Sequence, residues 1–398
     1  MNTLTKNNRW ATGSLIAAIL LVAMNLRVPF TGVAPVLRWI QHDFSLSTTA
    51  VGLLTSLPLL AFAAFSPFSA SIAARFGLER TLFGALAFIA AGVVMRSGGS
   101  TWTLYGGTVL IGAGIALGNV LLPSLIKRDF PANVVSLTGA YSITMGVAGA
   151  IGSAAVIPLT QAWGWRASLA MFVIVPLVAL LAWMPQWKKQ GKAAGSSRRQ
   201  AEGVAVWRSP LAWQVTLFMG LNAMPFYIAV SWLPTILMEQ GISATAAGSM
   251  HGTLQLATAV PGLILAAVLR RMKDQRAAAV IASLMSAVAM IGLMLAPSLA
   301  LLWSVVLGFG CGASMILGLT FIGLRTSNAK DAAALSGMSQ CVGYLMAAAG
   351  PMMLGGLHDV FGGWSTPLLL ASVIAVLGAW SGLLAGRNVH LEPAVATN

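Results

Sequence analysis

The chain has 398 residues, of which 58% are hydrophobic and only 8% are charged, and its formal net charge is +14. Soluble domains contain about 25% charged residues, so this composition excludes an ordinary soluble protein and indicates an integral membrane protein. The basic residues lie in short segments between apolar runs, which argues against a nucleic-acid partner. The sequence contains no catalytic, cofactor or metal-ligand motif, so we expect no enzymatic activity, no cofactor and no metal.

Apolar runs of about 20 residues, the length that crosses a bilayer as a helix, recur along the whole chain. The first run follows MNTLTKNNRW and is too long for a signal-peptide core, so we interpret it as a span. Charged or turn residues separate the runs. The sequence thus predicts twelve helical spans, at residues 11–37, 48–73, 81–98, 102–125, 134–160, 166–187, 210–238, 244–269, 276–296, 299–324, 332–356 and 364–386.

The distribution of Lys and Arg predicts the orientation, because cytoplasmic loops carry the excess of basic residues. With the N-terminus inside, nineteen of the 23 basic residues are cytoplasmic. Arg38, Arg96 and Arg166 then fall outside, and Arg27 lies within the first span. We therefore expect both termini to be cytoplasmic.

The longest polar segment, residues 188–209, follows span six and is basic and rich in Gly, Ser and Ala. It divides the chain into a predicted N-terminal six-helix bundle, 1–187, a cytoplasmic basic linker, 188–209, and a C-terminal six-helix bundle, 210–398. The composition of the linker is typical of a flexible or surface-lying segment in contact with anionic lipid head groups.

The two halves of the chain resemble each other at a shift of 196 residues. The least common matches are a Pro-Phe pair and a pair of arginines: Pro29–Phe30 with Pro225–Phe226, and Arg75 and Arg80 with Arg271 and Arg276. A repeat of six spans is parallel, with its axis along the membrane normal. We therefore predict an all-α integral membrane fold of two parallel six-helix repeats, with a solute site near the midplane between them.

Three stretches of the first half are distinctive: MNLRVPFTGVAPVL, GLLTSLPLLAFAAFSPFSASIAARFGLER and GIALGNVLLPSLIKRDFP. They resemble the cyanate and 2-nitroimidazole transporter family of the major facilitator superfamily, and the 2-nitroimidazole transporters are the more similar of the two. The resemblance extends over essentially the whole chain. It implies the major facilitator fold and transport of a small anion or planar polar solute across the bacterial inner membrane, and we expect a monomer.

The loop after span two departs from the superfamily pattern Gly-x-x-x-Asp-Arg-x-Gly. Ala70 and Ala74 replace the Gly and the Asp, so the usual carboxylate latch is absent at this position. Three loop carboxylates could replace it: Glu79, Asp129 and Asp331. The predicted cytoplasmic gate loops contain Arg75, Gly77, Arg80, Arg271 and Arg276.

Arg27 lies about 25 Å from the inner end of span one and about 16 Å from its outer end, at a rise of ~1.5 Å per residue. A charge at such depth costs between about 2.5 and 17 kcal/mol. All nine carboxylates lie in loops, the linker or a tail, and Ala223 stands at the equivalent position of the second half. We therefore predict that Arg27 binds an anionic or nitro-bearing solute through two parallel hydrogen bonds. The alternative is an arginine bonded to backbone carbonyls between helices.

Other polar and aromatic side chains at membrane depth could complete this site, although helix packing is the alternative for each of them. His251 is the candidate for proton coupling, and its alternative is a neutral, hydrogen-bonded histidine. Phe30 and Trp232 could stack on a flat ring. The predicted substrate-binding residues are Asn25, Arg27, Thr31, Asn119, Tyr141, Asn222, Phe226, Tyr227, Gln255, Gln340 and Tyr344.

The sequence therefore predicts a secondary transporter in which two halves rock about Arg27. Two alternatives remain open at this point: efflux of other neutral or anionic compounds, and a non-transporting membrane receptor.

Overall fold

A computed structural model describes residues 2–130, 133–187, 204–269, 271–326 and 329–391. Within these ranges every regular element is a helix, and nine helical stretches are long and apolar enough to cross a membrane. Helices suit a bilayer because they bond all their backbone polar groups internally. One of the nine, Ser136–Gln186, contains predicted spans five and six; predicted spans eight and eleven are helical but lie outside the nine.

Each predicted span falls on one helix or on consecutive helices. The first six fall on α1 (Asn2–Asn25), α2 (Val28–Thr31), η1 (Ala34–Val36), α3 (Leu37–Asp43), α4 (Thr48–Phe76), α5 (Leu78–Arg96), α6 (Thr101–Asp129), α7 (Val134–Met171), α8 (Ile174–Trp183) and η2 (Met184–Gln186). The last six fall on α10 (Pro210–Glu239), α11 (Ala244–Ala257), α12 (Pro261–Leu269), α13 (Arg276–Leu295), η3 (Pro297–Leu299), α14 (Ala300–Leu324), α15 (Ala329–Phe361) and α16 (Ser365–Ala385).

The predicted linker is described only at its end. Residues 188–203 lie outside the described residues, whereas Val204–Arg208 form a short helix, α9, which the sequence did not predict.

The two halves that are similar in sequence also have similar backbone features at equivalent positions. Ser47 caps α4 by accepting a hydrogen bond from the N–H of Ala50, and Ser243, 196 residues later, caps α11 by accepting one from the N–H of Ala246. Gly164 and Gly362, which are 198 residues apart, have φ angles of 78° and 68° at the turns before spans six and twelve. Glycine tolerates these angles because it has no Cβ.

The first span is not the continuous helix that the sequence predicted. Leu26 and Arg27 form a turn, in which their N–H groups donate to the carbonyls of Ala23 and Met24. Pro29 and Pro35 follow closely, and each lacks an N–H for a carbonyl of the preceding turn. The equivalent helix α10 stays continuous despite its own two internal prolines. The interruption therefore belongs to the half that carries Arg27.

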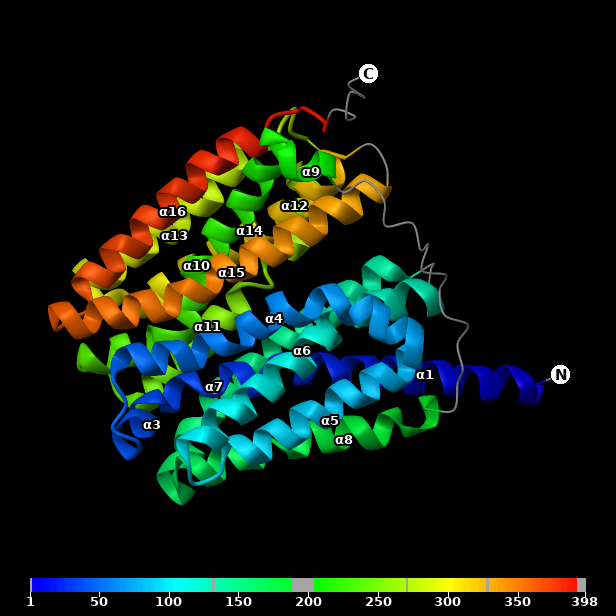
Figure 1. The fold of residues 1–398 in the computed structure, drawn as a ribbon, viewed down its shortest axis with the longest axis horizontal. Coiled ribbons are helices and arrows are strands. Elements are labelled where there is room, and N and C mark those ends of the chain that lie inside the picture. The colour runs from blue at the N-terminus through cyan, green and yellow to red at the C-terminus, as the bar shows by residue number, and fades with distance from the viewer. Residues whose placement is uncertain (1, 131–132, 188–203, 270, 327–328, 392–398) are drawn as a thin grey trace.

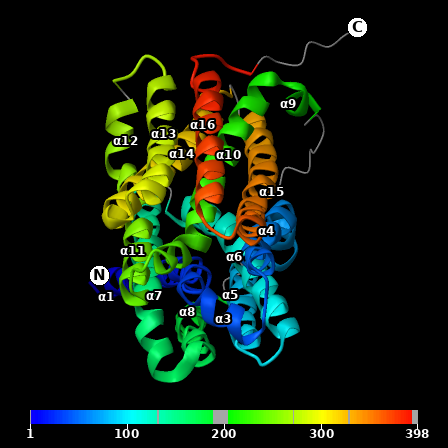
Figure 2. The ribbon, with the colours of Figure 1, turned by 90° about the vertical axis from the view of Figure 1, so that its left-hand side faces the viewer.

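Helices α1–α8 and α9–α16 form two groups, which lie side by side along α4 and α15 and along α7 and α11 (Figures 1 and 2). Glycines allow the backbones to approach here. A Cβ on Gly52 would lie 2.6 Å from the carbonyl oxygen of Pro351, and one on Gly252 would lie 2.9 Å from that of Ala150. The ribbons of the two groups diverge toward the side of Figure 1 on which α1 begins.

Candidate functional site

Arg27 lies at the break of the first span, as the residue before α2. Its stem packs on α7, where its Cγ lies 3.4 Å from the position that a Cβ on Gly149 would take. Its Cζ lies 5.2 Å from the ring centroid of Phe226, in the other group of helices. Its Nε is buried without a hydrogen-bond partner, and no carboxylate of the described residues pairs with it.

The ring of Phe226, which faces this guanidinium, belongs to a chain of aromatic contacts between the two groups. Tyr227 lies edge-on to Phe30 and to Phe226, with centroid distances of 5.9 and 5.0 Å. Tyr344 lies 5.3 Å from Phe62 and 6.5 Å from Tyr227. Such edge-to-face packing stabilises aromatic clusters. We call these five rings the aromatic cluster; together with Arg27 they supply one two-donor cation and several flat faces.

His251 is fully buried in α11 and connects the two groups. Its Nδ1 lies 3.0 Å from the Oγ of Ser153 in α7, and its Nε2 lies 3.5 Å from the Nε2 of Gln255. The Ser153 hydroxyl is also 3.4 Å from the carbonyl of Thr31, to which it can donate. This carbonyl lacks its usual helical donor because residue 35 is proline. A chain of polar contacts thus joins His251 to the interrupted first span.

Residues 15–351 match the sequence profile of the Major Facilitator Superfamily. The chain belongs to the Major Facilitator Superfamily. A 2-nitroimidazole transporter of Escherichia coli (strain K12) is 55% identical over 379 residues, which cover 95% of this chain and 96% of that protein. The cyanate transport protein CynX of the same strain is 27% identical over 353 residues, covering 88% and 91%. These matches confirm the predicted family.

Solved structures confirm the predicted fold. A bacterial homologue of the human lysosomal transporter Spinster, in an inward-facing and occupied conformation, superposes with a TM-score of 0.77. The identity is 18%, and the match covers 95% of this chain and 97% of that one. The family match and the 55% identical relative make this chain a membrane transporter, and the solved structure shows that it has the major facilitator fold.

Three of the predicted solute-stacking or solute-binding residues turn toward neighbouring helices of their own group. Asn25 donates to the carbonyls of Leu21 and Val175. Asn222 donates to the carbonyl of Phe218 and packs on Gly378 of α16, and Trp232 donates to the carbonyl of Pro351. The position of each residue along its predicted span suggested the depth of the site. The rotation of each helix about its axis, however, directs these three side chains into contacts between helices.

The other predicted solute-binding residues differ in their hydrogen bonds and in their burial. Thr31 donates to the carbonyl of Arg27 and lies 3.4 Å from that of Gly149, so it joins the break to α7. Gln340 donates to the hydroxyl of Ser336. Asn119 and Tyr141 are half-buried, and their binding roles stay predictions. Sequence reasoning missed Ser153 and Phe62 as site residues, because a serine and a phenylalanine in apolar helices carry no distinguishing signal.

The loop that departs from the superfamily pattern contains Gly77, whose φ of 90° allows α5 to begin directly after α4. Two of the carboxylates considered as replacements for the missing latch both pair with Arg128. Its Nη2 lies 2.6 Å from Glu79 Oε1, and its Nε lies 2.6 Å from Asp129 Oδ1. The Glu79 pair joins α5 to α6, whereas Asp129 is the neighbour of Arg128 in α6 itself, and neither pair bridges the two groups. The predicted gate arginines are exposed: Arg75, Arg80, Arg271 and Arg276.

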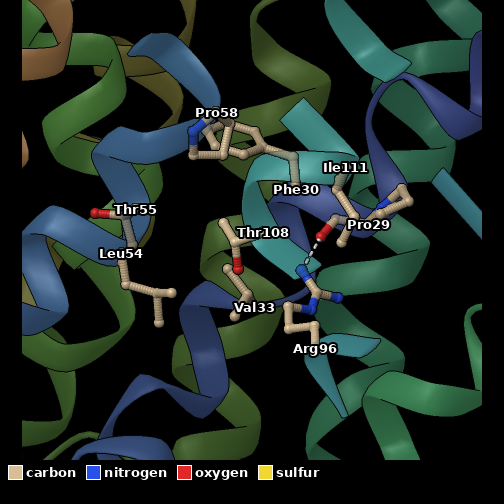
Figure 3. Close-up of a pocket in the computed structure, with 9 residues that line it drawn as sticks. All are labelled: Pro29, Phe30, Val33, Leu54, Thr55, Pro58, Arg96, Thr108 and Ile111. Carbon is tan, nitrogen blue, oxygen red and sulfur yellow. Dashed lines mark hydrogen bonds between the residues drawn. The ribbon is translucent and has the colours of Figure 1, made fainter. Parts of the chain in front are cut away.

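Arg96, which the sequence places near the end of predicted span 81–98 on the outer side, is buried. It is the last residue of α5 and only 2% exposed, and its Nη1 donates to the carbonyl of Pro29 at 2.6 Å (Figure 3). A Cβ on Gly107 of α6 would collide with the backbone of Arg96. Because α5 and α6 cross so closely at this residue, the guanidinium is enclosed between the helices instead of reaching water.

Proposed function

We propose that this protein is a secondary transporter of a small planar or anionic solute, similar to 2-nitroimidazole or cyanate, with Arg27 as the main ligand. The proposal rests mainly on Arg27 Nε, which is buried without a hydrogen-bond partner at a helix break between the two groups. A guanidinium edge supplies two parallel donors, which match two oxygens of a nitro group or an anion. The aromatic cluster supplies faces on which a flat ring can stack.

Alternating access would follow from rocking of the N-terminal bundle, 1–187, against the C-terminal bundle, 210–398. The contacts of α4 with α15 and of α7 with α11 would then close the outer side, and the inward-open state would be the one observed. This orientation takes both termini as cytoplasmic in the bacterial inner membrane. The protein would work as a monomer surrounded by lipid and would leave its solute chemically unchanged.

His251 is the residue that we propose for proton coupling, if a proton accompanies the solute. It is buried between the groups and bonded to Ser153, so a change in its charge would alter a contact that joins α7 and α11. Transport by His251→Gln would then lose its dependence on an imposed pH gradient but keep downhill exchange. An unchanged gradient dependence would assign His251 a purely structural role.

Uptake into proteoliposomes tests the proposal, with labelled 2-nitroimidazole and cyanate in separate assays. We expect Arg27→Ala to lose transport by more than tenfold and Arg27→Lys to lose most of it, since Lys keeps the charge without the planar fork. Arg38→Ala is the matched control, because Arg38 is an exposed arginine shortly after the break. Normal transport by a folded Arg27→Ala would contradict the proposed role of Arg27.

The same assay separates import from export. Counterflow measured with the protein inserted in each orientation would show whether the protein favours efflux of neutral heteroaromatic compounds over anion uptake. Absence of transport for every solute, combined with solute binding, would favour the receptor alternative.

A further inference from the structure

A groove between α5 and α8 lies outside the proposed transport site. The two helices lie side by side in Figure 1 and contact each other. The groove has a volume of about 230 Å³, whereas one water needs only about 10–15 Å³, so several methylene groups of a chain can lie in it. Its lining is apolar and consists of Phe83, Leu177, Leu180, Leu181 and Met184.

The groove is accessible from the lipid. Leu177, Leu181 and Met184 are 47%, 66% and 57% exposed. Both helices lie within stretches that are long and apolar enough to cross a membrane, 78–96 and 136–186, and exposed apolar side chains on such helices face hydrocarbon. An occupant can therefore enter sideways from the bilayer, without passing through the protein.

The groove is a departure from the repeat. At shifts of 196 and 198 residues its lining corresponds to small residues of α13 and α16, all of which are buried: Ala279, Ala375, Gly378, Ala379 and Gly382. A Cβ on Gly382 would lie 2.9 Å from the Cβ of Ala279, so α13 and α16 pack directly on each other. The larger side chains of α5 and α8 prevent such close packing and leave the groove between them.

A cationic side chain lies near one end of the groove. Arg80 is exposed and precedes Phe83 by one turn of α5, so the two residues share a helix face. Because side chains tilt toward the N-terminus of their helix, Arg80 leans toward the bilayer surface at which α5 begins. No carboxylate of the described residues pairs with Arg80, and its neighbour Glu79 is bonded to Arg128.

Two tryptophans lie at the same end. The ring of Trp187 is 4.6 Å from that of Phe83 and nearly perpendicular to it. Trp183 donates its indole N–H to the carbonyl of Glu79, so α8 ends where α5 begins. Tryptophans are enriched at the membrane–water interface. The groove thus begins near the interface and runs along α8 into the apolar part of the bilayer, toward Leu177.

We propose that this groove binds a phospholipid with a negatively charged head group. One acyl chain lies along α8 between Leu177 and Met184, and the head-group phosphate accepts hydrogen bonds from the guanidinium of Arg80. The apolar groove by itself would accept the chain of any lipid. The unpaired arginine at its end is what favours an anionic head group.

Photo-crosslinking in proteoliposomes tests this site. The probe is phosphatidylglycerol with a diazirine in one acyl chain, as a minor component of a phosphatidylcholine bilayer, and mass spectrometry locates the labelled residues. We expect it to label residues 177–184 about fivefold more than phosphatidylcholine with the same diazirine does, the preference that one basic residue near the surface supplies. Excess inorganic phosphate should not compete, because it lacks an acyl chain; competition by phosphate would overturn the lipid assignment.

Two variants separate the head group from the chain, each with a matched control. Arg80→Gln should abolish the preference for phosphatidylglycerol, whereas Arg276→Gln should keep it, since Arg276 is the equivalent exposed arginine and already pairs with Asp274 at 3.4 Å. Leu181→Trp fills the groove and should reduce labelling of α8 by both lipids. Leu377→Trp, the same change at an exposed position of α16, should leave that labelling unchanged.

Three results would overturn the site. The first is equal labelling of α8 by the two lipids in the wild type, and the second is an unchanged preference in Arg80→Gln. The third is labelling by phosphatidylglycerol that is as strong on the exposed face of α16 as on α8, which would indicate ordinary contact with the bilayer.

Discussion

The carboxylate of Asp359, near the end of α15, caps the first turn of α4 at Thr49, which belongs to the opposite group of helices. Its Oδ2 accepts hydrogen bonds from the N–H of Thr49 at 2.8 Å and from the Thr49 hydroxyl at 2.7 Å, and its Oδ1 accepts one from the N–H of Thr48 at 3.1 Å. Carboxylates are favourable at helix N-termini. In the proposed alternating-access cycle this contact breaks whenever the two groups separate at this end of the molecule.

We expect Asp359→Asn to shift the population toward states that are open at this end. A carboxylate at a helix N-terminus contributes up to about 1 kcal/mol, which corresponds to roughly a fivefold change in population. Distances between spin labels at the start of α4 and the end of α15 would measure the shift. Asp43→Asn is the control, because Asp43 bonds Trp165 within one group; an equal shift in both variants would contradict the capping role.

The same contact should be insensitive to pH near neutrality. Burial raises the pKa of Asp359, but the hydrogen bonds from Thr48 and Thr49 together lower it by a larger amount. The pKa of this carboxyl therefore lies below its ordinary value. A carboxyl whose pKa is lowered by folding stabilises the folded protein fully at a pH above its pKa in the unfolded chain, about 3.9. This stabilisation is lost as the pH falls through the pKa of the carboxyl in the folded protein. The spin-label distance should therefore stay constant from about pH 5 to 8, and opening within that range would contradict this interpretation.

Gly52→Ala should oppose closure of α4 on α15. A Cβ at this position would lie 2.6 Å from the carbonyl oxygen of Pro351 and 2.8 Å from the Cα of Met352, so the backbones would have to separate. Gly139→Ala is a matched control, since a Cβ at this position would meet no atom within 4 Å. This substitution should stabilise the helix by up to about 1 kcal/mol, because Ala has the higher helix propensity. We expect slower transport for Gly52→Ala alone; equal rates in the two variants would contradict a close-packing role.

Phe226→Leu should weaken solute binding more than turnover. The ring of Phe226 faces the guanidinium of Arg27 at 5.2 Å, and a partly desolvated cation–π contact contributes about 0.5–2 kcal/mol. In the proposed site the ring would also offer a face on which the solute can stack. We expect KM to rise by roughly 2- to 30-fold with little change in kcat. A selective loss of kcat would instead indicate that Phe226 acts in the conformational change.

Arg128→Met should lower the stability of the folded protein. It leaves Glu79, which is almost fully buried, without its partner at 2.6 Å, and breaking a buried ion pair costs about 3–5 kcal/mol. Because the Arg128 side chain is about a quarter exposed, we expect a loss at the lower end of that range. Asp129→Asn removes only the exposed partner and should cost less than about 1 kcal/mol. Thermal unfolding of both variants in detergent checks the difference.

The sequence alone was sufficient to identify the family and the positions of the spans. Hydropathy is informative here because a backbone in lipid must satisfy its hydrogen bonds internally. An apolar helix of about 20 residues meets this requirement and crosses the bilayer. The repeat was also visible in the sequence, in matches such as Ser47 with Ser243. The positions of the nine carboxylates, all outside the predicted spans, were the basis for predicting that Arg27 has no acidic partner.

Only the tertiary structure decided which way each side chain faces. Depth along a span says nothing about rotation around the helix axis, so Asn25 and Asn222 looked similar to Tyr227 in the sequence but pack into neighbouring helices. The burial of Arg96 depends on how closely α5 crosses α6. The contact of Asp359 with Thr49 joins residues 310 positions apart. Such relationships are set by packing between distant helices, because local sequence encodes the helix but not its neighbours.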